Sequence, residues 1–211
     1  MSLDDVVAAV LREMSPVEIV AAALTAWGVW LQARRRMLSF PVNLAGVALY
    51  AWVFFHAKLY SDLLLQGFFA ATLAYGWVQW TRGVVPDGTV SVVMPSRREL
   101  LLGTAAGLAG ILVLGYPMSH FTDAAAPWLD ATLTSFSLVA NFWLARRYIE
   151  NWPLWIALDV VYVGLYGYKH LFVTALLYAF LLVLCCYAFA QWRRALAGQG
   201  GAGVLAGSPA A

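Results

Sequence analysis

Five side chains in the second half of the sequence have the types and spacing of a binding surface for an aromatic cation. They are Trp152, Trp155, Asp159, Tyr162 and Tyr166, and intervals of three and four residues place them on one face of a helix. Indole and phenol rings around a carboxylate bind a flat cation through cation–π contacts and charge pairing. The pattern therefore predicts a site for a cationic, aromatic small molecule.

Asp159 is the central residue of this prediction because it lies about two turns into a hydrophobic segment. A carboxylate at that depth in a membrane is costly, and membrane proteins that keep one commonly use it in function. The structural alternative is a hydrogen bond with Asn43, Tyr50 or Tyr162 that holds two helices together. Both interpretations stay open at this stage.

Polar and aromatic side chains elsewhere extend the candidate substrate site. These further candidates are Asn43, Tyr50, Gln66, Trp77, Trp80, Asn141, Asn151 and Tyr178. Four of them have a structural alternative: Trp80 fits an aromatic belt at the membrane surface, and Asn141 fits a polar stripe that packs two helices together. Asn43 and Gln66 fit either purpose.

Enzyme chemistry is not indicated. His56, His120 and His170 fall at helix ends without an HExxH motif, and no GxSxG motif occurs. Lys58 and Lys169 also fall at helix ends, so no lysine is placed for a retinal Schiff base. We expect no catalytic residue, cofactor or metal, and a net charge of +2 gives no indication of a nucleic-acid partner.

The composition indicates an integral membrane protein, because 63% of the 211 residues are hydrophobic and only 11% are charged. The apolar runs predict an all-α fold with seven transmembrane helices. The predicted spans are 16–33, 40–56, 62–80, 98–116, 131–145, 152–168 and 171–192. Residues 1–15 form an amphipathic stripe that predicts a helix on the membrane surface. Residues 196–211 are rich in Gly and Ala and are predicted to be disordered.

The basic residues predict the orientation. Seven spans place ten arginines on one side of the membrane: Arg34, Arg35, Arg36, Arg82, Arg97, Arg98, Arg146, Arg147, Arg193 and Arg194. The other side keeps only Arg12, Lys58 and Lys169. Since basic residues concentrate in cytoplasmic loops, we expect the N-terminus outside and the C-terminus in the cytoplasm.

The sequence is also duplicated. An alignment without gaps of residues 33–82 with 145–194 gives fourteen identities in fifty positions, including paired Arg, Pro, Tyr, Gln and Trp. This predicts a parallel repeat in a 3+1+3 arrangement, with repeat one at about 16–82, a linker helix at about 98–116 and repeat two at about 131–194. Transporters with such repeats bind substrate between them.

The two repeats differ at positions that would line the space between them. Asn43, Val47 and Gln66 correspond to Trp155, Asp159 and Tyr178. We expect a pseudo-symmetric cavity with an asymmetric lining, which suits an asymmetric ligand.

Two pairs of motifs resemble the PnuC family of bacterial vitamin transporters. Residues 59–66 (LYSDLLLQ) with 75–80 (YGWVQW) resemble its third-helix signature, and residues 148–156 (YIENWPLWI) with 174–178 (TALLY) resemble its second-half signature. The likeness covers about residues 16–195. The family is similar in fold to the SWEET sugar transporters, which share the 3+1+3 plan.

The resemblance implies a bacterial inner-membrane transporter that takes up nicotinamide riboside. It also implies facilitated diffusion, trapping of the substrate by intracellular phosphorylation, and a homotrimer with one pathway in each protomer. The family's substrate-contact motifs carry over to Trp77, Trp80, Asn151, Trp152 and Trp155.

Two departures leave the choice of vitamin open. Some nicotinamide-type members have Asn where this chain has Leu73, and some have Asn where it has Asp159. Thiamine, another cation, is the alternative substrate, while neutral riboflavin gains less from a carboxylate. A membrane receptor or subunit that does not transport is the alternative from a different class.

Overall fold

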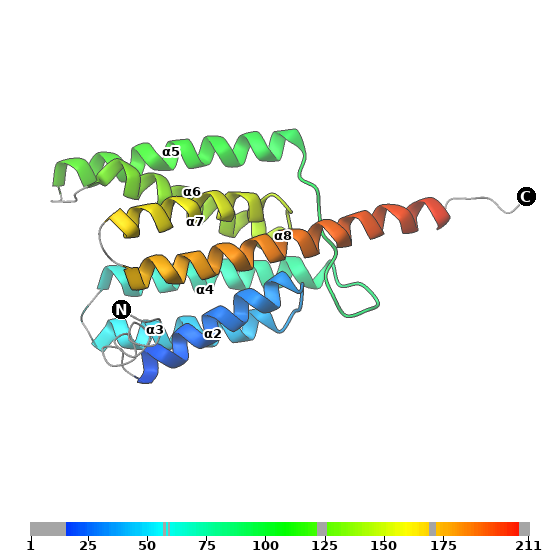
Figure 1. Ribbon diagram of the computed structural model, residues 1–211, viewed down its shortest axis with the longest axis horizontal. Helices are drawn as coiled ribbons and strands as arrows, with labels where there is room; N and C mark the ends of the chain where they lie inside the picture. Colours follow the sequence, from blue (N-terminus) through cyan, green and yellow to red (C-terminus); the bar gives the residue numbers. More distant parts are fainter. Residues whose placement is uncertain (1–15, 57, 59, 122–125, 169–171, 207–211) are drawn as a thin grey trace, which may run out of the picture.

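The computed structural model describes residues 16–56, 58, 60–121, 126–168 and 172–206, and this part of the chain is helical apart from its connections and three isolated β-bridges (Figure 1). The helices are α2 (Pro16–Ala33), α3 (Ser39–His56), α4 (Tyr60–Thr81), α5 (Arg97–Phe121), α6 (Pro127–Ala145), α7 (Asn151–Tyr168) and α8 (Phe172–Ala206). Each corresponds to one predicted span. The amphipathic segment predicted at residues 1–15 lies outside the described residues.

Three segments of the described helices are long and apolar enough to cross a membrane by length and composition. They are Ser39–His56, Arg97–Phe121 and Ala175–Gln199. The all-helical fold predicted from the sequence is confirmed, and three of the seven predicted spans meet this criterion within the described residues.

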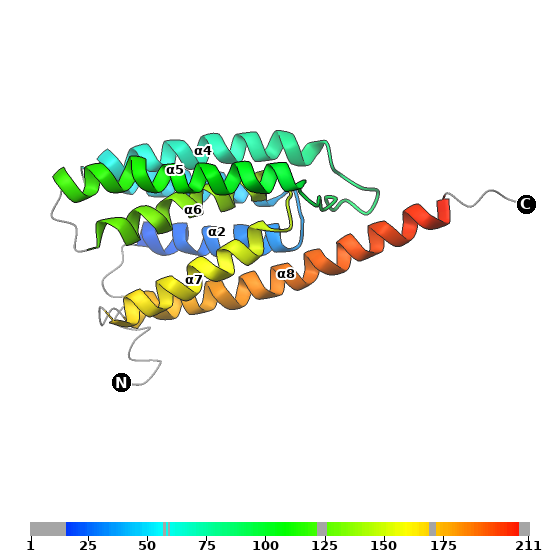
Figure 2. The same cartoon turned by 90° about the horizontal axis from the view of Figure 1, so that it is seen from above.

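The prediction of disorder from residue 196 is wrong for residues 196–206, because α8 continues to Ala206 and extends past the other helices (Figures 1 and 2). Contacts with the α4–α5 connection support this extension as far as Gln199. Ala195 and Leu196 pack against a cluster that includes Val90 and Val92. The side-chain amide of Gln199 also lies 3.0 Å from both the backbone nitrogen and the carbonyl oxygen of Val92, in the orientation that lets it donate and accept.

The helices contact one another in a closed order. α2 packs on α3, α3 on α4, α4 on α6, α6 on α7, α7 on α8, and α8 again on α2. Helix α5 lies outside this order, against α6. Six helices thus surround a common interior.

Turns of the same conformation precede α3 and α7. Arg35 and Arg147, which align with each other in the duplication, have φ angles of 57° and 64°. Non-glycine residues seldom adopt positive φ, so the recurrence is informative. The guanidinium of Arg34 also lies 4.5 Å from the ring centroid of Trp30, as that of Arg146 lies 5.8 Å from the ring centroid of Phe142.

Two buried indoles cross between the halves of the chain at the end of the bundle that carries these turns. Trp80 Nε1 donates to the Leu144 carbonyl oxygen at 3.1 Å, and Trp192 Nε1 donates to the carbonyl oxygens of Gln32 at 3.2 Å and Ala33 at 3.1 Å. Trp192 is the counterpart of Trp80 in the duplication, and Gln32 is the counterpart of Leu144 when the alignment is extended toward the N-terminus. The two indoles also pack against each other, with ring centroids 5.9 Å apart.

Candidate functional site

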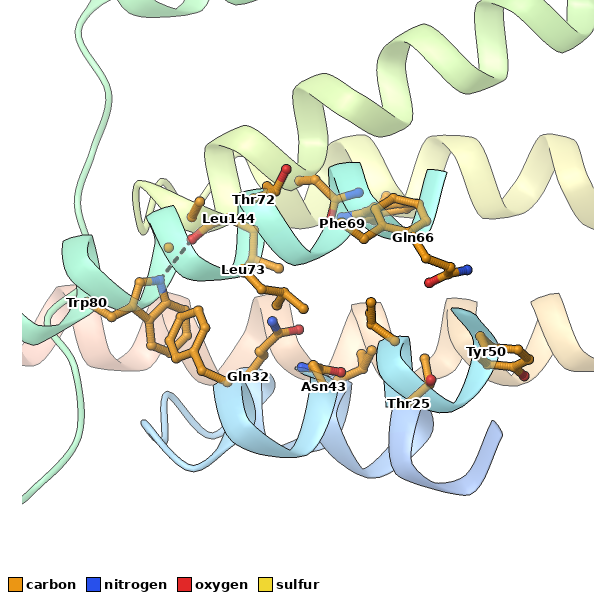
Figure 3. Close-up of a pocket in the computed structure, with 17 residues that line it drawn as sticks. Thr25, Gln32, Asn43, Tyr50, Gln66, Phe69, Thr72, Leu73, Trp80 and Leu144 are labelled. Atoms are coloured by element: carbon orange, nitrogen blue, oxygen red, sulfur yellow. Dashed lines mark hydrogen bonds between the residues drawn. The ribbon is translucent and has the colours of Figure 1, made fainter. Parts of the chain in front are cut away.

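A cavity of about 320 Å³ lies between α2, α3, α4 and α6, with one side chain from α7 (Figure 3). Four carboxamides line it: Gln32, Asn43, Gln66 and Asn141. Its aromatic lining consists of Phe40, Tyr50, Phe69, Trp80 and Trp155. This combination can hydrogen-bond and stack a small planar molecule.

Asn43 is the lining residue with an unmet hydrogen-bonding need. Its side chain is buried, and its Nδ2 has no partner within the described part of the chain. Gly28 makes room for it, because a Cβ at position 28 would overlap the carboxamide. An unsatisfied buried donor is costly, so a ligand acceptor at this position would gain free energy from binding.

Aromatic rings form the end of the cavity nearest the arginine-bearing turns. Phe40 packs edge-on against Trp80, with ring centroids 5.1 Å apart and an interplanar angle of 86°. The indole N–H of Trp80 is already bonded to Leu144. Trp80 therefore offers a ligand its ring rather than a donor.

Six of the thirteen site residues predicted from the sequence line this cavity. They are Asn43, Tyr50, Gln66, Trp80, Asn141 and Trp155. They come from four different helices, and the fold brings them together.

The other predicted residues do not line this cavity. Trp77 is partly exposed, with its ring stacked 6.1 Å from that of Phe40. Asn151 is fully buried and donates from Nδ2 to the Tyr148 carbonyl oxygen at 2.6 Å. Trp152 is buried against Trp192, with centroids 5.5 Å apart and an interplanar angle of 80°.

Asp159 and three predicted tyrosines are packed on α7 and α8. Tyr178 stacks on Tyr162 with centroids 4.4 Å apart and on Tyr166 with centroids 5.3 Å apart. Asp159 is 2% exposed, accepts a hydrogen bond from Cys185, and leaves its Oδ2 without a partner in the described part of the chain. A substrate contact by these four residues stays a prediction.

Sequence reasoning missed several lining residues, among them Thr25, Gln32, Phe40, Thr72 and Leu73. The duplication carried a usable signal for one of them. Phe40 corresponds to the candidate Trp152, so applying the candidate face of repeat two to repeat one would have nominated it.

The sequence model of the nicotinamide mononucleotide transporter family matches residues 15–194. The chain belongs to this family. The resemblance stated from the motifs is thereby confirmed, and the chain is assigned to transporters rather than to enzymes.

Relatives of this chain are named as transporters of vitamins. The chain is 25% identical over 205 residues to the nicotinamide riboside transporter PnuC of Escherichia coli K12, covering 85% of this chain and 86% of the relative. It is 31% identical over 140 residues to the riboflavin/roseoflavin transporter RibM of Streptomyces davaonensis, covering 63% of each. The crystal structure of the vitamin B3 transporter PnuC has the same fold, with a TM-score of 0.68 and 24% identity over 90% of this chain and 86% of that one.

Proposed function

We propose that this protein takes up nicotinamide riboside across the bacterial inner membrane. The observation that carries the proposal is a cavity lined by four carboxamides and five aromatic rings in a member of this transporter family. Carboxamide side chains both donate and accept, so they match the carboxamide of nicotinamide and the hydroxyls of ribose. The rings suit its flat pyridinium.

The lining favours the riboside over the phosphorylated mononucleotide. No Lys or Arg is among the described residues that line the cavity, and a phosphate in a closed site needs cationic partners. We therefore assign the unphosphorylated nucleoside as substrate. Facilitated diffusion followed by intracellular phosphorylation would then hold the product inside the cell.

Riboflavin is the second candidate. No carboxylate is among the described lining residues, so the cavity itself does not require a cation, and the relative from Streptomyces davaonensis bears the name of a riboflavin transporter. The volume of about 320 Å³ is at the low end of the usual ~300–1,000 Å³ for small-molecule sites. That size favours the smaller nucleoside.

We further infer a 3+1+3 parallel repeat of seven transmembrane helices, as in SWEET-like transporters. The paired indole–carbonyl bonds at equivalent positions of the duplication support it, as does the position of α5 outside the closed order of helices. A pseudo-twofold axis then runs between the halves. With the arginine-bearing turns in the cytoplasm, the N-terminus lies outside, and family likeness favours a homotrimer.

Asp159 would supply negative charge beside the cavity. It lies one helical turn after Trp155, which lines the cavity. A buried carboxylate attracts a cationic ring over several ångströms, because the protein interior screens charge weakly. The same attraction would apply to thiamine, the other cationic vitamin.

The test is calorimetric titration of the purified protein with nicotinamide riboside, thiamine and riboflavin. We expect the riboside to bind at least tenfold more tightly than the other two. Tighter binding of thiamine or riboflavin would change the vitamin and keep the transporter. Counterflow of the bound vitamin in proteoliposomes then separates a transporter from a receptor, which would bind without moving its ligand.

A further inference from the structure

The connection between α4 and α5 is folded against both halves of the bundle. Residues 83–93 are called the strap here. Thr89 in the strap forms an antiparallel bridge with Arg36, which precedes α3. Val93 forms a parallel bridge around Tyr148, donating to the Arg147 carbonyl oxygen at 3.0 Å and accepting from the Ile149 nitrogen at 3.2 Å.

Two arginines at equivalent positions of the duplication bind neighbouring residues of the strap. Arg35 Nη1 donates to the Val90 carbonyl oxygen at 2.9 Å, and Arg147 Nη1 donates to Ser91 Oγ at 2.7 Å. Since the two acceptors are adjacent in sequence, the strap crosses the bundle where the two halves meet. Gly83 is required here, because a Cβ at that position would overlap the Arg147 guanidinium.

The inner side of the strap packs against the indoles at this end of the bundle. Val90 and Val92 are buried in one cluster with Trp80, Trp152 and Trp192. Trp80 also lines the cavity. Trp80 therefore belongs both to the cavity wall and to the indole layer against which the strap packs.

The strap is anchored by its own turn and by a third element. Asp87 accepts from the Thr89 nitrogen and hydroxyl, both at 2.7 Å, and these hydrogen bonds lower the pKa of the Asp87 carboxyl. On α8, the Gln199 side chain pairs with the backbone of Val92. Beside the strap, Tyr148 donates to Glu99, and burial together with that bond raises the pKa of Tyr148 to about 12.

We propose that the strap is the gate at this end of the transporter, and that opening the cavity to the cytoplasm requires it to detach from at least one half of the bundle. The proposal rests on the transport function and orientation proposed above. When both halves hold the strap, the indole layer stays packed and the substrate has no exit on this side. Detachment would expose Val90 and Val92 and free the indoles to part.

The test uses two engineered cross-links in a background in which Cys185 and Cys186 are replaced by Ser. Arg36→Cys with Thr89→Cys ties the strap to the first half, and Val93→Cys with Tyr148→Cys ties it to the second. Bridge partners lie within about 5.5 Å of each other, which is within reach of a disulfide or a short thiol cross-linker. Flux of radiolabelled nicotinamide riboside into proteoliposomes and its binding to the same protein are measured before and after reduction.

The parent is the protein in which Cys185 and Cys186 are replaced and no cross-link is introduced. We expect the protein with either single cross-link to retain at least half of the parent's flux. Both together should lower flux at least tenfold, with affinity unchanged and flux restored by reduction. Flux within twofold of the parent's in the doubly cross-linked protein would overturn the gate. Loss of binding there would also overturn it, because the strap would then shape the site.

Measurements on the parent protein distinguish failure of the gate from failure of the proposed function. If the parent neither binds nor transports nicotinamide riboside, the substrate assignment fails. The flux of riboflavin through the doubly cross-linked protein is then compared with its flux through the parent. Failure of the gate alone shows as full transport by parent and doubly cross-linked protein alike.

Discussion

The two halves of this protein share a pair of equivalent hydrogen bonds between helices and differ in the side chains that pack between those helices. In both, an indole from the last helix of one half donates to a carbonyl of the other half, as Trp80 does to Leu144 and Trp192 does to Gln32. Further along the bundle from these hydrogen bonds, residues of the first half line most of a cavity of about 320 Å³. The corresponding face of the second half is closed by stacked tyrosines.

Side-chain volume explains the difference. Gln66 lines the cavity in the first half, and Tyr178 takes its place in the second, where it stacks on Tyr162. Val47 lines the cavity, while its counterpart Asp159 is buried beside Cys185. The duplicated positions thus make equivalent hydrogen bonds between helices, and a few side chains that differ decide which half lines the cavity.

The largest expected effect comes from copying the filled half into the open one. Gln66→Tyr introduces the residue found at position 178 and should fill the cavity. We expect affinity for nicotinamide riboside to fall at least about 100-fold, or ~2.7 kcal/mol, with little change in thermal stability. Calorimetry and a thermal melt measure the two quantities.

Leu64→Tyr is the matched control, because Leu64 is on the same helix and is 77% exposed. It should bind like the parent. Equal affinities for Gln66→Tyr and the parent would show that the substrate occupies another site.

Asp159→Asn tests whether the closed half contributes its charge. We expect affinity for nicotinamide riboside or thiamine to fall about tenfold, or ~1.4 kcal/mol, because the cationic ring loses a buried negative charge. Affinity for neutral riboflavin should stay within twofold. If all three vitamins bind unchanged, Asp159 has only the structural role of its contact with Cys185.

Asn43→Leu tests the polar lining of the open half. The variant removes the unpartnered Nδ2, so we expect substrate affinity to fall about fivefold, ~1 kcal/mol, for one lost hydrogen bond. Thermal stability should not fall, because the unliganded protein loses no hydrogen bond at that atom. The comparison variant is Thr25→Val, whose hydroxyl already donates to the Ala21 carbonyl oxygen at 2.9 Å, and it should bind normally. The reverse ranking would remove Asn43 from the site.

The smallest expected effect concerns the two indole–carbonyl hydrogen bonds that cross between the halves. Trp80→Phe and Trp192→Phe each remove one indole donor, and each should lower the free energy of unfolding by about 1 kcal/mol, as measured by denaturant titration. Only Trp80→Phe should also change substrate affinity, because Trp80 lines the cavity. Unequal losses of stability would show that the two crossing bonds are not equivalent.

The sequence predicted the positions of the helices closely, because long apolar runs between polar connections leave the backbone few alternatives in a membrane. It was wrong about residues 196–206, since Gly and Ala composition carries no information about Val92 and the other strap residues that α8 meets. The motif resemblance was specific enough to give the family. It did not show which half of the duplication holds the cavity.

The sequence by itself determined the class of fold, the duplication and the pool of aromatic and carboxamide residues from which a site is built. Tertiary structure alone decided that Gln32, Asn43, Gln66 and Asn141 face one cavity while Tyr162 and Tyr178 stack against each other. Helical periodicity specifies the face on which a residue lies. Whether that face is hollow depends on the summed volumes of side chains from several helices, and no single segment contains that information.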